Sequence, residues 1–255
     1  MSRFVLKFGT GVLSRLGGRA LDGAQFRRIA EEVAELVKNG HSCVLVSSAA
    51  IAAGVSVLGL DSRPDDLPGK QACAAAGQPE LMRMWAAAFR RHGLSVAQLL
   101  LTHDDIDSRM RHKNARNTLE RLLAHGGIIP IINENDSVAV EELRLGDNDR
   151  LSAEVAVLFH ASKLLILTSS DGLTDQAKKR IPIIRDMEKA FRLVRPEKGE
   201  MSVGGMKTKL EAVQLALAAH IPTIIIDGKK KGHIVKAAAF QDVGTRFPAP
   251  RIKRP

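Results

Sequence analysis

Cysteine is scarce in this chain, and histidine is scattered. The two cysteines, Cys43 and Cys73, lie among apolar or small residues and form no close pair. This usage is typical of buried thiols in a reducing compartment, and it excludes a disulfide framework and a cysteine-based zinc site. The eight histidines include no His-Glu-x-x-His pair, so each is expected to be structural or exposed. We therefore predict no metal site built by the protein itself.

Segments that direct a protein to a membrane are also missing. Residues 1 to 7 do not contain the long apolar region of a signal peptide. Residues 43 to 60 are apolar enough to imitate a membrane span, but serines and glycines interrupt them, so a strand, a turn and a helix fit better. We predict a cytoplasmic protein with no membrane contact.

Positive charge is concentrated near the C-terminus. The formal net charge is +10, and residues 227 to 255 contain eight Lys or Arg and two Asp. Aromatic side chains are not interleaved with these cations, so a solvated basic tail from about residue 246 is favoured over a nucleic-acid contact. RNA binding through this tail stays open as an alternative function. A positive field would also favour anionic substrates.

Apolar strands and amphipathic helices alternate along the chain. This alternation predicts one α/β domain over residues 1–255, with a parallel sheet that helices cover on both faces. Ligands of such sheets bind outside the carboxyl ends of the strands. The predicted strands are 4–8, 43–47, 95–101, 128–132, 163–167 and 223–226, with a weaker patch at 181–184. The predicted helices are 22–38, 49–58, 71–92, 113–125, 150–160 and 206–220.

Two loops at these carboxyl ends have features of phosphate sites. Lys7 precedes Gly9-Thr10-Gly11 at the end of the first strand, where glycines let backbone amides approach oxygen and the lysine supplies charge. Residues 204 to 209, GGMKTK, open a helix, and the N-terminus of a helix attracts anions. Neither loop matches the Walker A sequence or the dinucleotide-binding fingerprint.

Residues 133 to 150 are rich in acids and amides, with Asn, Asp or Glu at nine of eighteen positions. A solvated polar loop is one interpretation. A site for a small zwitterion is the other, because an ammonium group binds carboxylates and a carboxylate binds amide donors. Together with the phosphate loops, this segment favours phosphoryl transfer to a small acid. Such an acceptor has a reference pKa of about 4.3 and is already a nucleophile at pH 7, so no general base is required.

Six motifs follow one another along the chain: VLKFGT (5–10), VSSAAIAAG (46–54), AAGQ (75–78), NEND (133–136), GDND (146–149) and GGMKTK (204–209). Their order resembles the amino acid kinase family, and within it the members that phosphorylate glutamate. The resemblance covers about residues 4–244. It implies an α/β fold, a three-layer sandwich with a mainly parallel central sheet. It also implies ATP with Mg²⁺ and phosphorylation of the γ-carboxylate of L-glutamate, the first step towards proline.

The resemblance also implies roles for individual residues. Lys7 and Lys209 would act as catalytic residues that stabilise the transferring phosphoryl group, and Asp147 would hold these lysines in place. Lys207 is the nearest competitor of Lys209, and sequence alone does not separate the two. The implied glutamate-binding residues are Ser48, Asn133, Asp136, Asn148 and Asp149. The implied nucleotide-binding residues are Lys7, Gly9, Thr168, Ser169, Gly204, Gly205, Met206, Lys207, Thr208 and Lys209.

Further expectations concern partners and domains. The resemblance implies assembly of identical subunits, and it makes hand-over of the labile acyl phosphate to a glutamyl phosphate reductase plausible. Many members of the family carry a C-terminal PUA domain, and we expect none here.

Several positions depart from the family pattern. Ala49 replaces a glycine, and alanine is costly there if the position requires a positive φ. Ser169 replaces an aspartate in the nucleotide loop, and the segment before Gly204 is shortened. Two alternatives therefore stay open: a sibling kinase that acts on N-acetylglutamate, aspartate, carbamate or a nucleoside monophosphate, and a catalytically weakened binding protein that senses an amino acid such as glutamate or proline.

Overall fold

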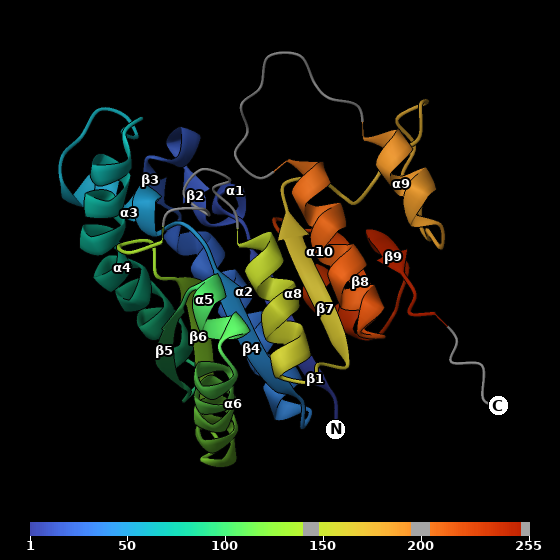
Figure 1. The fold of residues 1–255 in the computed structure, drawn as a ribbon, viewed down its shortest axis with the longest axis horizontal. Helices are drawn as coiled ribbons and strands as arrows, with labels where there is room; N and C mark the ends of the chain where they lie inside the picture. Colours follow the sequence, from blue (N-terminus) through green and yellow to red (C-terminus); the bar gives the residue numbers. More distant parts are fainter. Residues whose placement is uncertain (140–147, 195–204, 251–255) are drawn as a thin grey trace.

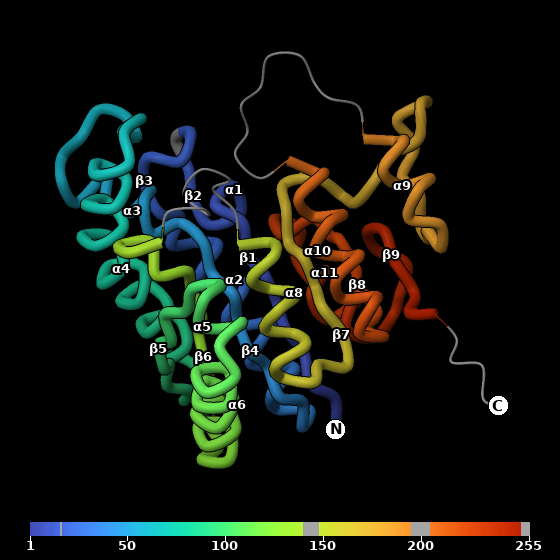
Figure 2. Tube along the Cα trace, viewed as in Figure 1, coloured from blue at the N-terminus to red at the C-terminus, as the bar shows by residue number. Residues whose placement is uncertain are grey.

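A seven-stranded sheet organises the computed structural model, which describes residues 1–139, 148–194 and 205–250. The strand order is β5-β6-β4-β1-β7-β8-β9, and all neighbours are parallel except that β9 runs antiparallel to β8. The strands are β1 (Arg3–Phe8), β4 (Ser42–Ser47), β5 (Ser95–Leu101), β6 (Ile128–Glu134), β7 (Lys163–Thr168), β8 (Thr223–Asp227) and β9 (Thr245–Phe247). Figure 2 traces the chain from its N-terminus into β1, which lies between β4 and β7 at the centre of the sheet. A small hairpin of β2 (Ser14–Arg15) and β3 (Ala20–Leu21) lies outside this sheet.

Helices cover both faces of the sheet (Figure 1), which gives the predicted three-layer α/β arrangement. The α-helices are α1 (Thr10–Leu13), α2 (Gly23–Lys38), α3 (Ala50–Val57), α4 (Leu67–Arg90), α5 (His103–Asp107), α6 (Arg109–Ala124), α8 (Asp149–Leu158), α9 (Met187–Leu193), α10 (Met206–Ala218) and α11 (His233–Ala238). A 3₁₀ turn, η1 (Leu16–Gly18), lies within the β2–β3 hairpin.

Side-chain alternation along the strands separates two buried apolar clusters. Phe4, Leu6 and Phe8 of β1 pack into the cluster that contains residues of α2, α4 and α11. Val5 of β1 packs into the other cluster, with residues of α6, α8 and α10. Because side chains two apart point to the same face of a strand, Lys7 faces α8 and α10 as Val5 does. The central strand therefore delivers a lysine between these two helices.

Two glycines allow α3 and α4 to pack at very short range. A Cβ atom at Gly54 would lie 1.8 Å from the carbonyl oxygen of Cys73, and one at Gly77 would lie 2.0 Å from the carbonyl oxygen of Ala50. Both distances are far below van der Waals contact, so only glycine fits at either crossing point. The close packing fixes α4 next to the loop that precedes α3, which bears Ser48.

The predicted fold class is confirmed, and so are the six predicted strands. Several short elements were not predicted, among them α5, α9, α11 and β9, because they are too short to show a periodic pattern. Helix α4 begins at Leu67 rather than at 71, since the Asp66 side chain accepts a hydrogen bond from the amide of Gly69 and caps the helix. In the weak patch at 181–184, Ile183 forms a single bridge to Arg246.

The C-terminal region is more ordered than a solvated tail. Arg246 lies in β9, and Lys230 forms an ion pair with Asp171 at 2.9 Å. Residues 251–255 of the predicted tail lie outside the described part of the chain. No helix in the described residues has the length and apolar character required to cross a lipid bilayer.

Candidate active site

A buried carboxylate on α8 joins two lysines that come from β1 and α10. The Nζ of Lys7 lies 2.6 Å from Oδ1 of Asp149, and the Nζ of Lys209 lies 3.0 Å from Oδ2. The side chains of Lys7 and Asp149 are 1% and 0% exposed. Ion pairs in such a dry environment are strong and hold their partners in a defined geometry. The cluster lies at the carboxyl end of β1, on the side of the sheet where ligands bind.

Asp149 contacts both lysines, whereas the resemblance gave that task to Asp147 and placed Asp149 among the glutamate-binding residues. Asp147 lies outside the described residues. In the described part of the chain, Asp149 is the first residue of α8 and its carboxylate points at Lys7 and Lys209. Asp149 is therefore placed to hold the ammonium groups of both lysines in position.

The first turn of α10 separates Lys209 from Lys207. The hydroxyl of Thr208 donates to Oδ2 of Asp149 at 2.9 Å, next to the Nζ of Lys209. Lys207 points away from this cluster: its side chain is 75% exposed and lies 3.9 Å from Glu211, one turn further along the helix. The structure therefore brings Lys209 to the buried cluster and leaves Lys207 on the surface.

Backbone donors of two glycine loops lie near the lysines. Gly205 is the N-cap of α10 and, as a glycine, provides no side-chain cap for the amides of the first turn, which begins at Met206. The amide of Gly9 bonds to the carbonyl of Leu167 at 3.3 Å, which ties the first glycine loop to the end of β7. Gly204 lies outside the described residues.

The loop after β7 contains Thr168 and Ser169, the other residues predicted for nucleotide binding. Ser169 is exposed, and the carbonyl of Thr168 accepts from the amide of Gly228 at 2.8 Å. Sequence reasoning did not find the neighbouring cluster of Asp171, Lys230 and His233. Burial tends to raise the pKa of the Asp171 carboxyl, but the hydrogen bond from Lys230 and the surrounding positive charges outweigh it and lower that pKa. Burial also lowers the pKa of His233.

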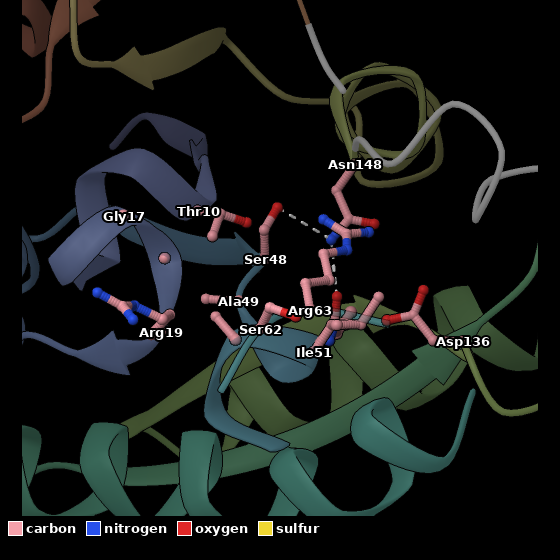
Figure 3. A pocket seen from close by; sticks show the side chains of 13 residues that line it. Thr10, Gly17, Arg19, Ser48, Ala49, Ile51, Ser62, Arg63, Asp136 and Asn148 are labelled. Atoms are coloured by element: carbon pink, nitrogen blue, oxygen red, sulfur yellow. Dashed lines mark hydrogen bonds between the residues drawn. The ribbon is translucent and has the colours of Figure 1, made fainter. Parts of the chain in front are cut away.

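A pocket of about 280 Å³, lined by polar and apolar residues, lies next to Asn148, the residue before Asp149 (Figure 3). It gathers four of the five predicted substrate residues, Ser48, Asn133, Asp136 and Asn148. Sequence reasoning missed the contributions of Thr10, of Gly17 to Arg19 in the β2–β3 hairpin, of Ala49, Ile51 and Ala52, and of Ser62 and Arg63. Thr10, Ala49, Ile51 and Ala52 lie inside two of the motifs but had no role assigned to them in this pocket. Gly17 to Arg19, Ser62 and Arg63 belong to no motif, and the folded chain alone brings them to the site.

A chain of side-chain amides holds Asn148 in one orientation. Its Nδ2 donates to Oδ1 of Asn133 at 2.7 Å and to the carbonyl of Ser47 at 2.9 Å, and it lies 3.3 Å from Oγ of Ser48. Asn133 in turn donates to Oε1 of Gln78 at 2.8 Å, and Gln78 donates to Oε1 of Gln98 at 2.8 Å. Because the amide nitrogen of Asn148 is committed to the protein, its Oδ1 is the atom that can accept a hydrogen bond from a ligand.

The amide chain leads to a second pocket of about 430 Å³ between α4, β5 and the loop after β6. Gln78 and Gln98 line this second pocket, and Asp136 lines both pockets. The motif AAGQ contained Gln78, but its spacing alone gave no hint that the side chain would reach Asn133.

Ala49 adopts a left-handed backbone conformation, with φ 84° and ψ 12°, between β4 and α3. The family pattern has glycine at this position, and we expected alanine to be costly here if the position requires a positive φ. The φ of Ala49 is indeed positive. Ala49 lines the first pocket next to Ser48, so the strained residue shapes the site itself. In the described residues, no three His, Cys, Asp or Glu side chains are grouped closely enough to hold a metal ion.

Comparisons with known proteins agree with this geometry. Residues 2–227 match the amino acid kinase family. The chain is 46% identical over 257 aligned residues to a glutamate 5-kinase of Thermus thermophilus, and the alignment covers 99% of this chain and 69% of that protein. It is 45% identical to a glutamate 5-kinase of Anaeromyxobacter dehalogenans, covering 97% of this chain and 67% of the relative. A glutamate 5-kinase of Geobacter sulfurreducens is 42% identical, with 97% and 68% covered.

Proposed function

Because the chain belongs to the amino acid kinase family, we propose that it transfers the terminal phosphoryl group of ATP to the γ-carboxylate of L-glutamate. The product is L-glutamyl 5-phosphate, and the reaction is the first step towards proline. One observation carries this proposal: Asp149 binds both Lys7 and Lys209 directly beside a pocket lined by Ser48, Asp136 and Asn148.

The pocket has the chemistry that a small amino acid requires. The carboxylate of Asp136 suits an α-ammonium group, and the oriented Oδ1 of Asn148 is a further acceptor for it. The hydroxyl of Ser48 can donate to a carboxylate oxygen. An acylated amine would lose the ion pair with Asp136, so a free amino acid is favoured over an N-acetylated acid. A volume of about 280 Å³ suits a small acid better than a nucleoside monophosphate.

The nucleotide phosphates fit the opposite side of the lysine cluster. The ammonium groups of Lys7 and Lys209 supply positive charge there, and the first-turn amides of α10 supply N–H donors. Gly9, which has no side chain, leaves space next to the Nζ of Lys7. Thr168, Ser169 and the loop around Asp171 would line the rest of the nucleotide site. Magnesium bound with the nucleotide would neutralise part of the phosphate charge.

The protein's own residues have little covalent chemistry to perform. The acceptor carboxylate is ionised at pH 7, so no residue has to remove a proton. Lys7 and Lys209 would neutralise the negative charge on the transferring phosphoryl oxygens, and Asp149 with Thr208 would keep both ammonium groups in position. Burial of the cluster excludes water, which would otherwise screen these charges and hydrolyse the acyl phosphate.

Three further predictions belong to the same proposal. The enzyme would act in the cytoplasm, it would assemble from identical subunits, and it would hand its labile product to a reductase.

Formation of ADP with L-glutamate, L-aspartate and N-acetyl-L-glutamate tests the proposed reaction. We expect turnover with L-glutamate and a loss of about 10²- to 10³-fold in kcat for Lys209→Ala, the magnitude typical of a residue that stabilises transition-state charge. Lys38→Ala, an exposed lysine at the end of α2, serves as the matched control. Turnover with N-acetyl-L-glutamate or L-aspartate in preference to L-glutamate would show that the preferred compound, and not L-glutamate, is the acceptor. Binding of L-glutamate by a folded protein without any turnover would contradict the enzyme proposal and favour a protein that senses glutamate.

A further inference from the structure

Arg63 brings a positive charge to the acceptor pocket from a loop that no motif identified. It lies between the end of α3 at Val57 and the start of α4 at Leu67, and it lines the same pocket as Asp136 and Asn148. In Figure 3 its side chain extends over the pocket, whereas Arg19 points away from Ser48. Arg63 is therefore placed to meet a ligand bound between Ser48 and Asp136.

The charge of Arg63 is not used elsewhere in the described part of the chain. Among residues 1–139, 148–194 and 205–250, its guanidinium forms no ion pair and no side-chain hydrogen bond. Arg83 on α4, by contrast, is paired with Glu80 at 2.7 Å. An arginine that lines a pocket without a carboxylate partner is a candidate for binding an anionic ligand.

The proposed substrate presents two carboxylates that need different partners. The γ-carboxylate must lie towards Lys7 and Lys209, where the phosphoryl group is transferred, and the ammonium group is matched by Asp136. The α-carboxylate then lies at the end of the pocket away from the lysines and requires a cation of its own. Arg63 and Asp136 line that pocket together, one positive and one negative. Such a pair is complementary to the α-ammonium and α-carboxylate of a free amino acid.

We propose that Arg63 binds the α-carboxylate of the acceptor and thereby determines specificity for a free α-amino acid. The inference rests on the proposed function, since it assumes an acidic amino acid as acceptor. A guanidinium can donate two parallel hydrogen bonds to one carboxylate, which adds geometric selection to the charge. An acceptor with a neutral group in place of the α-carboxylate provides no negative charge for the guanidinium of Arg63, so it binds more weakly. Because Arg63 in this arrangement holds the α-carboxylate and not the γ-carboxylate that reacts, it affects binding of the acceptor more than the rate of transfer.

Steady-state kinetics with L-glutamate and L-isoglutamine, its α-carboxamide, test this role in the full chain. Wild-type protein is expected to prefer L-glutamate by at least about tenfold in kcat/KM, the discrimination typical of a charge-assisted hydrogen bond. In Arg63→Met we expect KM for L-glutamate to rise about 10- to 100-fold, with a much smaller change in kcat and an unchanged KM for ATP. The preference over L-isoglutamine should fall to about threefold or less, since both acceptors then lack a cation.

Arg91→Met provides the matched control, because Arg91 is exposed at the opposite end of α4. Thermal unfolding of each variant reports on folding, and Arg63→Gln replaces Arg63→Met if the latter fails to fold. An unchanged KM for L-glutamate in the Arg63 variant, with wild-type protein active, overturns the inference alone. So does a rise in KM for ATP instead of L-glutamate. Absence of turnover with L-glutamate in wild-type protein overturns the proposed function, and the inference with it.

Discussion

The carboxylate of Asp149 lies 2.6 Å from the Nζ of Lys7, and neither side chain is reached by solvent. This ion pair ties the start of α8 to the end of the central strand. Lys209 binds the second oxygen of the same carboxylate. A single acidic side chain thus sets the positions of two cations that the proposed reaction needs.

Replacement of Asp149 by Asn should damage both stability and catalysis. The variant keeps the shape of the side chain but leaves two buried ammonium groups without the charge of their partner. Breaking a buried ion pair in this way costs about 3–5 kcal/mol in the free energy of unfolding. Urea unfolding measures this loss, and kcat should fall by about 10²-fold or more. Glu188→Gln, which removes an exposed i,i+4 pair with Arg192, should cost only about 0.3–0.5 kcal/mol. Near-wild-type kcat in a folded Asp149→Asn protein would contradict the assigned role.

The amide chain from Gln98 to Asn148 predicts a graded effect on substrate binding. Gln78→Met removes the acceptor for the Asn133 amide, so Asn133 and then Asn148 are less well oriented. We expect KM for L-glutamate to rise several-fold. We also expect the free energy of unfolding to fall by about 1–3 kcal/mol, because a buried amide loses its partner.

Gln98→Met is the control, since Gln98 is exposed and lies one hydrogen bond further from Asn148 along the amide chain. Its effect on KM should be smaller than that of Gln78→Met. Equal effects of the two variants, or a loss of stability with KM unchanged, would show that the chain supports the fold and does not position Asn148.

Ala49 and Ala50 should respond to glycine in opposite directions. Ala49 has φ 84°, a conformation in which alanine is strained by about 1–2 kcal/mol and glycine is not. Glycine loses more conformational entropy on folding than alanine does, which offsets part of this gain. Ala49→Gly should therefore raise the free energy of unfolding by about 0.5–1 kcal/mol. Ala50 begins the helix, so Ala50→Gly should lower it by about 1 kcal/mol. Chemical denaturation measures both, and a loss of stability in Ala49→Gly would mean that the backbone is not strained.

We expect Lys163 to make the free energy of unfolding increase with pH in alkaline solution. It lies at the start of β7, its Nζ donates to the carbonyl of Ala238, and it sits 3.4 Å from the centroid of the Phe240 ring. Burial, with a smaller contribution from Arg246, lowers the pKa of Lys163 from 10.5 to about 8. Between these two values the unfolded chain binds more protons than the folded chain, so the free energy of unfolding rises with pH.

Denaturant unfolding from pH 7 to 10.5 measures this contribution as the difference between wild-type protein and Lys163→Met. The difference is needed because Cys43, whose pKa burial raises to about 12, contributes the opposite slope above pH 9. We expect the contribution of Lys163 to grow from about pH 8 upwards and to be absent from the variant. Parallel pH profiles of the two proteins would contradict a lowered pKa.

Local sequence determined the sheet and most of its long helices. Val5, Val44 and Ile166 belong to strands whose continuous apolar character requires burial on both faces, and the helices between them have one apolar face each. That pattern is set by neighbours in the chain, so it can be predicted without coordinates. Short elements such as α11 and β9 could not be predicted, because contacts with distant strands stabilise them.

Motif order likewise identified the family and most candidate site residues, since the loops that hold them are contiguous in sequence. Only the tertiary structure decided which side chains meet. It placed Lys209 and not Lys207 on Asp149, because two residues along a helix turn a side chain to the other side. It also placed Arg63 and Asp136 on one pocket and linked Gln78 to Asn148 through Asn133, although the separation of these segments in sequence contains no information about their distance in space.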